Sequence, residues 1–473
     1  MTVTDATRPW WTLAGTCMAL FVLMLDSTIV TLALPSIQRD LAASASELQW
    51  VMNGYLLAIA VLVVTAGRLG DQFGRKGVFV CGLATFAVGL VIAATASSIE
   101  LLIIARFVQG IGAAGMLTLS LALVSSVFDD ATRPRALGIW AGVSASALAV
   151  GPLVGGVLVD GLSWRWVFWV GVIPLVLGLW WTLVAAPEVR DESASHRIDV
   201  PGLATLTVGL TAIVLVLIEG HEWGWSSGKA LATLAIGVVA LAAFVAIEPR
   251  VREPVVEFGL FRNKPYLGAS AAAFCLVGAW WAVIFYMPQY LQGPLGYGPA
   301  ISGVLTLPIT APMMVISPIA PRLIARFGPR GLMTIGMVCG AVGVALMARL
   351  DDESGYLTLL PGFLLFGIAL GFVYSPMSIA AMEAMPRAKA GIAAGVLAMN
   401  RVLAGAVLLA ATGAIFAALM DSHNATYSLA HALWATIALL IVGAALTFWL
   451  VANPPHDPDA PPKHHRHPHT LPH

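Results

Sequence analysis

The sequence predicts an all-α protein that crosses a membrane many times. It has 473 residues, of which 59% are hydrophobic and 11% charged, with a mean hydropathy of +0.87. A soluble domain carries about 25% charged residues, so this chain lacks the charge that a water-exposed surface requires. Apolar runs of about 20 residues recur along it, each long enough to cross the hydrocarbon core as a helix. Helix is the required structure, because lipid offers the backbone no hydrogen-bond partner.

Fourteen spans are predicted, with both termini in the cytoplasm. With this arrangement, nineteen of the 25 Lys and Arg residues fall in cytoplasmic segments and four in outer segments. The positive-inside rule requires such a bias, and one missed helix would reverse it from that point onward. The predicted spans are 11–34, 48–66, 77–97, 101–124, 137–159, 166–186, 201–219, 229–247, 267–289, 300–320, 331–349, 358–381, 391–418 and 430–452.

An internal repeat divides the chain into halves. Segment 67–76 reads GRLGDQFGRK and segment 321–330 reads PRLIARFGPR, each predicted as a short cytoplasmic loop after the second helix of a half. Repeats of this kind are typical of transporters whose halves rock about a midplane site. The predicted organisation is a cytoplasmic N-terminus 1–10, a six-helix half 11–186, a loop 187–200, two inserted helices 201–247, a loop 248–266, a second six-helix half 267–452 and a disordered His- and Pro-rich tail 453–473.

Several functional classes receive no support. The net charge is zero and there is no basic block, so nucleic acid is not an expected partner. Cysteines occur singly within apolar runs, without disulfide or zinc spacing, and no metal or cofactor is predicted. A nucleotide-binding loop of the G-x-x-x-x-G-K-[ST] type does not occur. No nucleophile–base pair or metal-ligand cluster indicates an enzyme.

Two charged residues lie at similar depth in different spans. Asp26 is nine residues before Pro35, and Arg106 is six residues after Glu100, so their depths agree to within about 5 Å. Charges within a bilayer are costly, so we expect the two to meet or to share a polar cavity. Asp26 is the predicted proton-coupling group, with Arg106 beside it. The alternative is that Asp26 is a purely structural partner of Arg106.

Segment 67–76 resembles the loop signature of the major facilitator superfamily, G-x-L-x-D-x-x-G-R-K, at every defined position. Charge-assisted bonds in such a segment can differ between the two access states. The alternative is that its basic residues serve only topology. The resemblance implies a cytoplasmic gate formed by Gly67, Asp71, Gly74, Arg75 and Lys76.

Segment 138–156 reads GIWAGVSASALAVGPLVGG and resembles the antiporter signature of the exporter branches, with Ala147 in place of one Gly. Small residues allow helices to approach closely, and proline bends a helix at a moving interface. A generic Gly-rich packing face is the alternative. The resemblance implies export, with a motif that comprises Gly138, Gly151, Pro152, Gly155 and Gly156.

Segment 102–114 reads LIIARFVQGIGAA and resembles the fourth-helix signature R-x-x-Q-G-x-G-A-A. Segment 23–37 reads LMLDSTIVTLALPSI and resembles the fourteen-helix drug/proton antiporters (the EmrB/QacA subfamily), with Thr31 where that branch has Asn. Candidate cavity residues are Gln109, Trp281, Phe285, Tyr286, Gln289, Asn400 and Arg401. Packing explains the aromatic ones equally well. Glu219, His221 and Glu222, at the outer end of the seventh span, are interpreted as a solvated turn.

The sequence therefore predicts a proton-coupled antiporter that exports small lipophilic or amphipathic compounds, such as drugs, biocides or antibiotics. The expected partners are protons, a small-molecule substrate and the lipid bilayer, and a monomer is favoured. The frequent use of Arg over Lys indicates a bacterial source and hence the bacterial cytoplasmic membrane. A proton-coupled uptake symporter for a small metabolite, or a membrane receptor or scaffold without a transport cycle, are the alternatives.

Overall fold

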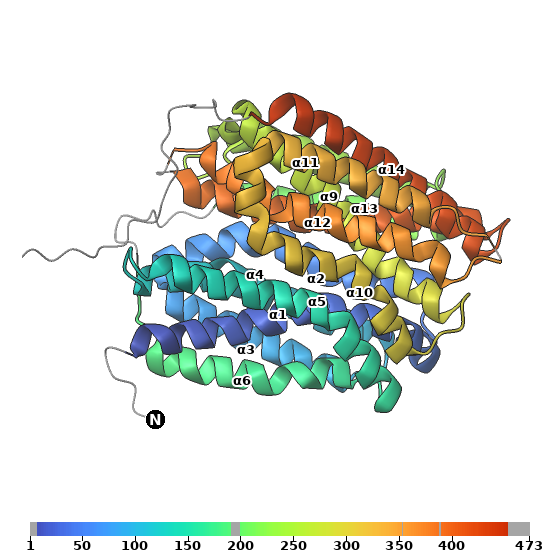
Figure 1. Cartoon of the computed structure of the whole chain (residues 1–473), viewed down its shortest axis with the longest axis horizontal. Helices are drawn as coiled ribbons and strands as arrows, with labels where there is room; N and C mark the ends of the chain where they lie inside the picture. Colours follow the sequence, from blue (N-terminus) through green and yellow to red (C-terminus); the bar gives the residue numbers. More distant parts are fainter. Residues whose placement is uncertain (1–6, 191–198, 352, 387–388, 453–473) are drawn as a thin grey trace, which may run out of the picture.

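The computed structural model of the chain is a bundle of long helices (Figure 1). It describes residues 7–190, 199–351, 353–386 and 389–452, which form fourteen α-helices and no strand. The helices are α1 (Arg8–Leu41), α2 (Ala45–Phe73), α3 (Arg75–Ala94), α4 (Ile99–Val127), α5 (Arg133–Gly161), α6 (Trp166–Ala185), α7 (Val200–Trp223), α8 (Gly228–Ile247), α9 (Lys264–Gln292), α10 (Pro299–Ile316), α11 (Ala320–Met347), α12 (Tyr356–Glu383), α13 (Ala390–Met420) and α14 (Ala425–Leu450).

Each predicted span overlaps one of these helices. Thirteen stretches of the described residues are long and apolar enough to cross a membrane. One of them, Pro299–Met347, has 49 residues and contains both α10 and α11. As a helix it would be about 70 Å long, more than twice the hydrocarbon thickness. At Gly328 its backbone leaves the helical conformation with φ of 70°, so this stretch supplies two crossings.

The two repeated segments are mostly helical, and the prediction of short loops is wrong. α2 continues to Phe73, Gly74 turns the chain with φ of 111°, and α3 begins at Arg75. In the second half the turn lies at Gly328, which aligns with Gly74 in the repeat. A single residue with positive φ is enough to turn the chain here, and glycine adopts that conformation without a Cβ clash.

The two halves share one pattern of helix pairing. In the first half α1 packs against α5 and α6, α2 against α4, and α3 against α4 and α6. In the second half α9 packs against α13 and α14, α10 against α12, and α11 against α12 and α14. Each of these pairs in the second half is the counterpart of a pair eight helices earlier. Two copies of one six-helix unit have this property.

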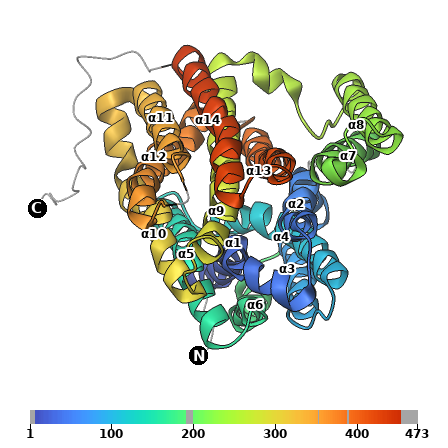
Figure 2. The same cartoon turned by 90° about the vertical axis from the view of Figure 1, so that its right-hand side faces the viewer.

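The inserted helices α7 and α8 lie together at one flank of the bundle (Figure 2). α7 contacts α2 of the first half and α13 of the second, while α8 packs against α7. In the most apolar stretch of α8 17% of the residues are buried, against 83% in α1 and in α9. α8 therefore presents most of its surface to lipid, whereas α1 and α9 occupy the centre of the bundle.

Two buried carboxyl groups lie where the inserted pair begins and ends. Asp199 caps α7, because its Oδ1 accepts a hydrogen bond from the backbone N–H of Gly202 at 2.8 Å. Glu248 follows α8 and accepts from the backbone N–H of Val256. Both side chains are buried, and they converge on Gly202. The hairpin is thereby fixed at this end by polar groups.

The start of α1 and the end of α14 lie at the same end of the bundle (Figure 1). This is the predicted cytoplasmic end, and we call the opposite one the outer end. At the outer end a Cβ built on Gly156 of α5 would stand 2.4 Å from the carbonyl oxygen of Pro299 on α10. Nearer the cytoplasmic end, no described atom of another helix lies within 4 Å of a Cβ built on Gly138 or Gly395. The halves are thus in close contact at the outer end.

Candidate functional site

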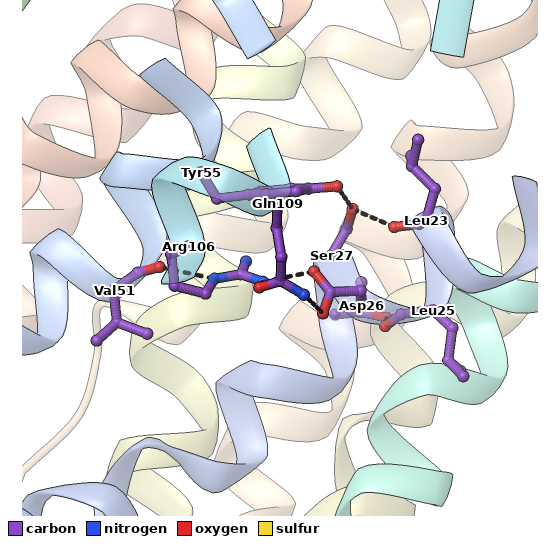
Figure 3. Close-up of polar contacts among 9 residues, drawn as sticks. Leu23, Leu25, Asp26, Ser27, Val51, Tyr55, Arg106 and Gln109 are labelled. Carbon is purple, nitrogen blue, oxygen red and sulfur yellow. Dashed lines mark hydrogen bonds and ion pairs between the residues drawn. The ribbon is translucent and has the colours of Figure 1, made fainter. Parts of the chain in front are cut away.

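A buried ion pair joins α1 to α4 (Figure 3). Arg106 Nη1 lies 2.6 Å from Asp26 Oδ2, and the two side chains are 0% and 3% exposed. Gln109 Nε2 donates to Asp26 Oδ1 over 3.3 Å, and Gln109 Oε1 accepts from Arg106 Nη1 at 2.8 Å. The structure therefore brings the three residues into one cluster. The contact between Asp26 and Arg106 agrees with their estimated depths, while a role in proton coupling stays a prediction.

α2 supplies further contacts to Arg106. Its Nε donates to the carbonyl oxygen of Val51 at 3.0 Å, and its guanidinium carbon lies 4.3 Å from the centre of the Tyr55 ring. A cation over an aromatic face contributes about 2 kcal/mol when desolvated. The Tyr55 hydroxyl also lies 3.5 Å from Ser27 Oγ. Sequence analysis missed Tyr55, because an aromatic residue within an apolar run reads as ordinary packing.

Glycines allow the three helices around this cluster to approach closely. A Cβ built on Gly110 of α4 would stand 2.6 Å from the carbonyl oxygen of Tyr55 on α2. One built on Gly112 would stand 2.5 Å from the carbonyl oxygen of Gly82 on α3. Small residues permit such backbone contact within a bilayer. They place α4 deep enough for Arg106 to reach across to α1.

The cluster can couple proton binding to helix contacts. Arg106 Nη2 is buried and has no hydrogen-bond partner among the described residues, so the carboxylate of Asp26 is the main balance for the cation. A proton on Asp26 would remove that negative charge and leave a buried cation without compensation, which is strongly unfavourable. The relative energies of two helix arrangements can therefore depend on protonation, as a switch requires.

The predicted gate residues form contacts within the first half. Asp71 Oδ1 lies 2.9 Å from Arg75 Nη2, one turn later across the glycine turn. Lys76 Nζ donates to the carbonyl oxygen of Leu183 at the end of α6, at 2.8 Å. A Cβ built on Gly67 would stand 2.8 Å from a side-chain methyl group of α4. These contacts bind α2, α3, α4 and α6 together at the cytoplasmic end.

Two residues that were not predicted extend the gate. Arg68 Nη1 donates to the carbonyl oxygen of Glu253 at 2.6 Å, and its Nη2 donates to that of Pro254. Glu188 accepts hydrogen bonds of 3.2 Å from the backbone N–H groups of residues 76 and 77. Arg68 therefore links α2 to the segment that follows the inserted helices. Its only sequence signal was its place inside the repeated motif.

The Gly-Pro segment of α5 packs closely on α1. A Cβ built on Gly151 would stand 1.9 Å from Thr28 Oγ1, and one built on Gly155 would stand 2.7 Å from the carbonyl oxygen of Ile29. The hydroxyl of Thr28 in turn lies 3.3 Å from the carbonyl oxygen of Leu148. Any larger side chain at the two glycines would push α5 away from α1.

The opposite face of the same segment meets the second half. A Cβ built on Gly303 of α10 would stand 2.4 Å from the carbonyl oxygen of Pro152, and Gly156 faces Pro299 in the same contact. Gly138, predicted in the same motif, faces open space instead. The motif therefore divides into an outer part at the interface of the halves and an inner residue that touches no other described helix.

The remaining cavity candidates lie in different places. Phe285, Tyr286 and Gln289 line a cavity of about 420 Å³ at the outer end of α9. Trp281 is not among its lining residues and packs against Gly405 of α13. Three of the predicted residues therefore share one cavity, and Gln109 belongs to the Asp26 cluster.

Asn400 and Arg401 bind within the second half. Asn400 Nδ2 donates to the carbonyl oxygen of Ser270 on α9 at 2.7 Å. Arg401 donates to the hydroxyl of Ser378, and its guanidinium carbon lies 5.0 Å from the centre of the Tyr374 ring, both on α12. Its Nε is buried without a partner in the described part of the chain. α12 thus supplies partners for a cation that forms no ion pair with a described acidic residue.

Some predictions fall outside the described residues. These are the His- and Pro-rich tail 453–473 with its basic residues, and the cytoplasmic basic residues Arg197 and Arg387. Within the described residues, no group of three or more His, Cys, Asp or Glu is arranged to hold a metal ion.

Comparison with known proteins places this geometry among transporters. The sequence profile of the Major Facilitator Superfamily matches residues 16–409. The chain is 35% identical to the tetracenomycin C resistance and export protein of Streptomyces glaucescens, over 87% of this chain and 76% of that protein. It is 33% identical to the puromycin resistance protein of Streptomyces alboniger, over 94% and 92%. It is 32% identical to the multidrug efflux pump LfrA of Mycolicibacterium smegmatis, over 89% and 84%.

Solved structures share the fold at low sequence identity. A D-xylose–proton symporter superposes with a TM-score of 0.67 at 16% identity, over 93% of this chain and 97% of that one. The peptide transporter POT, solved in complex with sulfate, superposes with a TM-score of 0.67 at 14% identity, over 93% and 94%. At these identities the likeness concerns the fold alone.

Proposed function

Because this chain belongs to the Major Facilitator Superfamily, we propose that it exports small lipophilic or amphipathic compounds in exchange for protons. It is a multi-pass transporter of the bacterial plasma membrane and not an enzyme. The observation that carries the proposal is the buried pair of Asp26 and Arg106, in a chain whose relatives are named for resistance and export.

The direction of transport is supported by the relatives. Three of them carry names that refer to resistance, export or efflux, with tetracenomycin C and puromycin as the named compounds. A membrane transporter that protects a cell must move the compound outward. The fold does not decide direction, because a proton symporter shares it. We therefore favour export over uptake on the sequence relationship.

Proton coupling is assigned to Asp26. While the carboxylate is charged, its bonds to Arg106 and Gln109 hold α1 against α4. Protonation weakens both bonds and loosens that contact. Thr28 follows two residues later on α1 and packs against Gly151 of α5, next to Pro152, which contacts Gly303 of the second half. The path from the proton site to the outer contact between the halves thus runs from α1 through α5.

We propose that cargo enters from the cytoplasm while the outer ends of α5 and α10 are in contact, as they are in the described conformation. In it, Asp71, Arg75 and Lys76 bond within the first half. Closure of the cytoplasmic end would bring the second half close to these charges, and we expect them to exchange partners then. Both halves belong to one chain, so a monomer suffices for this cycle.

Transport by the purified protein in liposomes tests the proposal. Puromycin and the dye rhodamine 6G serve as probes, with a pH gradient that is either imposed or absent. We expect the gradient to accelerate transport at least tenfold, and Asp26→Asn to abolish that acceleration while downhill transport continues. Glu353→Gln, in the exposed loop before α12, is the matched control and should behave as wild type. Equal wild-type rates with and without a proton gradient or voltage would refute the proposal.

A further inference from the structure

A cavity lies at the outer end of the bundle, away from Asp26. The cavity of about 420 Å³ is lined by residues of α2, α7, α9, α13 and α14, together with Gln38 at the end of α1. We call it the outer cavity. Asp26, Arg106 and Gln109 are not among its lining residues. α7, one of the two inserted helices, contributes Ile218, His221 and Glu222 to its wall.

One wall of the outer cavity is aromatic. The rings of Phe285 and Tyr286 are 4.8 Å apart at 78°, and those of Tyr286 and Phe416 are 5.3 Å apart at 39°. All three residues line the cavity. An assembly of this kind offers faces and edges on which a flat aromatic ligand can stack. The cavity is also large enough for such a compound, since small-molecule sites begin at about 300 Å³.

Two buried polar groups in the lining lack partners. The Tyr286 hydroxyl and Gln49 Oε1 make no hydrogen bond within the described structure, although their residues are 5% and 4% exposed. A buried polar atom without a partner costs about 1–3 kcal/mol. A ligand that donates a hydrogen bond to Gln49 and exchanges one with Tyr286 would remove both costs. Gly413 makes room for Gln49, because a Cβ there would stand 2.1 Å from Oε1.

The charged residues of the lining are acidic or weakly basic. Glu222 accepts a hydrogen bond from Ser46 Oγ at 3.2 Å, and Asp421 pairs with His221 at 3.2 Å. Neither lysine nor arginine is among the lining residues. Two carboxylates opposite one histidine leave a net negative rim, which attracts cations. Glu222 is exposed, as expected for a solvated end of α7, and these side chains also contact α2 and the end of α13.

We propose that the outer cavity is an exit-side binding site for flat aromatic amines that carry a positive charge and an N–H donor. This inference rests on the proposed export function, and it adds a class of substrate and a second binding site for that substrate. The aromatic wall would hold the ring system, Gln49 and Tyr286 the hydrogen-bonding groups, and Glu222 the charge. The inserted helix α7 would then be part of the site.

Binding of three dyes to the full-length protein in lipid nanodiscs tests the proposal. Rhodamine 6G is a cation with N–H donors, tetramethylrhodamine methyl ester is a cation without them, and Nile red is neutral without them. We expect Gln49→Leu to weaken rhodamine 6G binding about three- to tenfold and to leave tetramethylrhodamine methyl ester unchanged. Glu222→Gln should weaken both cations at low salt and spare Nile red.

Tyrosine supplies the matched control. Tyr286→Phe should weaken rhodamine 6G binding, whereas Tyr427→Phe should not, because Tyr427 stacks on His431 outside the cavity. Unchanged rhodamine 6G affinity in both Gln49→Leu and Tyr286→Phe would overturn the proposal, provided that both variants keep the wild-type melting temperature. A different result would refute the export function alone: dye transport that does not depend on the proton gradient, in a protein whose dye affinities still change in these variants.

Discussion

Asp26 on α1 and Arg106 on α4 are 2.6 Å apart and almost completely excluded from solvent. The pair costs both partners their hydration, and that cost is recovered only while they remain together with Gln109, Val51 and Tyr55. This makes the contact between α1 and α4 unusually sensitive to the charge on either residue. Stability can therefore be used to examine the pair independently of transport.

Removal of Arg106 alone should be more harmful than removal of both charges. Arg106→Met leaves the Asp26 carboxylate buried without its cation, at an expected cost of about 3–5 kcal/mol. Adding Asp26→Asn should recover part of that loss, because the stranded charge disappears. Thermal unfolding of the single and double variants in detergent gives the coupling energy. Purely additive losses would mean that the two side chains do not interact in the membrane protein.

The outer closure should depend on glycine where α5 meets α10. Gly303→Ala would place a methyl group 2.4 Å from the carbonyl oxygen of Pro152, so the two outer ends must separate. We expect a shift toward outward-open states, measured as longer distances between spin labels on the outer ends of α5 and α10. Gly138→Ala, in the same α5 motif but facing open space, is the control. Identical distance distributions in the two variants would contradict this packing.

Replacement of one carboxyl group of the Asp199–Glu248 pair by an amide should stabilise the protein. Asp199 Oδ2 and Glu248 Oε2 both lack partners among the described residues, and a Cβ on Gly202 would stand 2.2 Å from one and 2.6 Å from the other. Glu248→Gln keeps an acceptor for Val256 and adds a donor toward Asp199. We expect a gain of about 1 kcal/mol in thermal unfolding. Glu253→Gln is the control and should leave the stability unchanged. If Glu248→Gln lowered the stability as much as Glu248→Ala, the two carboxyl groups would not interact as described.

The two turn glycines should respond unequally to alanine. Both Gly74 and Gly328 have positive φ, so alanine at either costs about 1–2 kcal/mol in backbone conformation. Gly74→Ala also places a methyl group 2.2 Å from Glu188 Oε1, which should add to the loss. Melting temperatures of the purified variants provide the comparison. Gly331→Ala, in a helix with open space around it, should cause no loss.

Sequence pattern predicted the helices well, because a bilayer dictates both their length and their composition. It failed where one residue decides the path of the chain. The repeated segments look polar and loop-like, yet Gly74 and Gly328 alone leave the helix. The 49-residue stretch through α10 and α11 shows the same effect, since the basic segment 321–330 within it is helical except at Gly328.

The candidate site was predictable in its charges and less so in its neighbours. Counting residues from the span ends was enough to place Asp26 and Arg106 together, because helix rise is constant. Tyr55 carries no such signal, and its position over Arg106 depends on how α2 rotates. Phe285 and Arg401 were grouped as cavity residues, but the structure separates the outer cavity from the contacts of Arg401 on α12.

The position of α7 limits how this bundle can separate sideways. α7 contacts α2 and α13 at once, and the His221–Asp421 pair joins α7 to the end of α13. Arg68 links α2 to the segment that follows α8. At the opposite flank α5 meets α10, and no other helix of the described residues covers this contact (Figure 2). We expect lipophilic molecules dissolved in the bilayer to enter between α5 and α10. The two inserted helices would thus leave the transporter with one lateral entrance from the membrane instead of two.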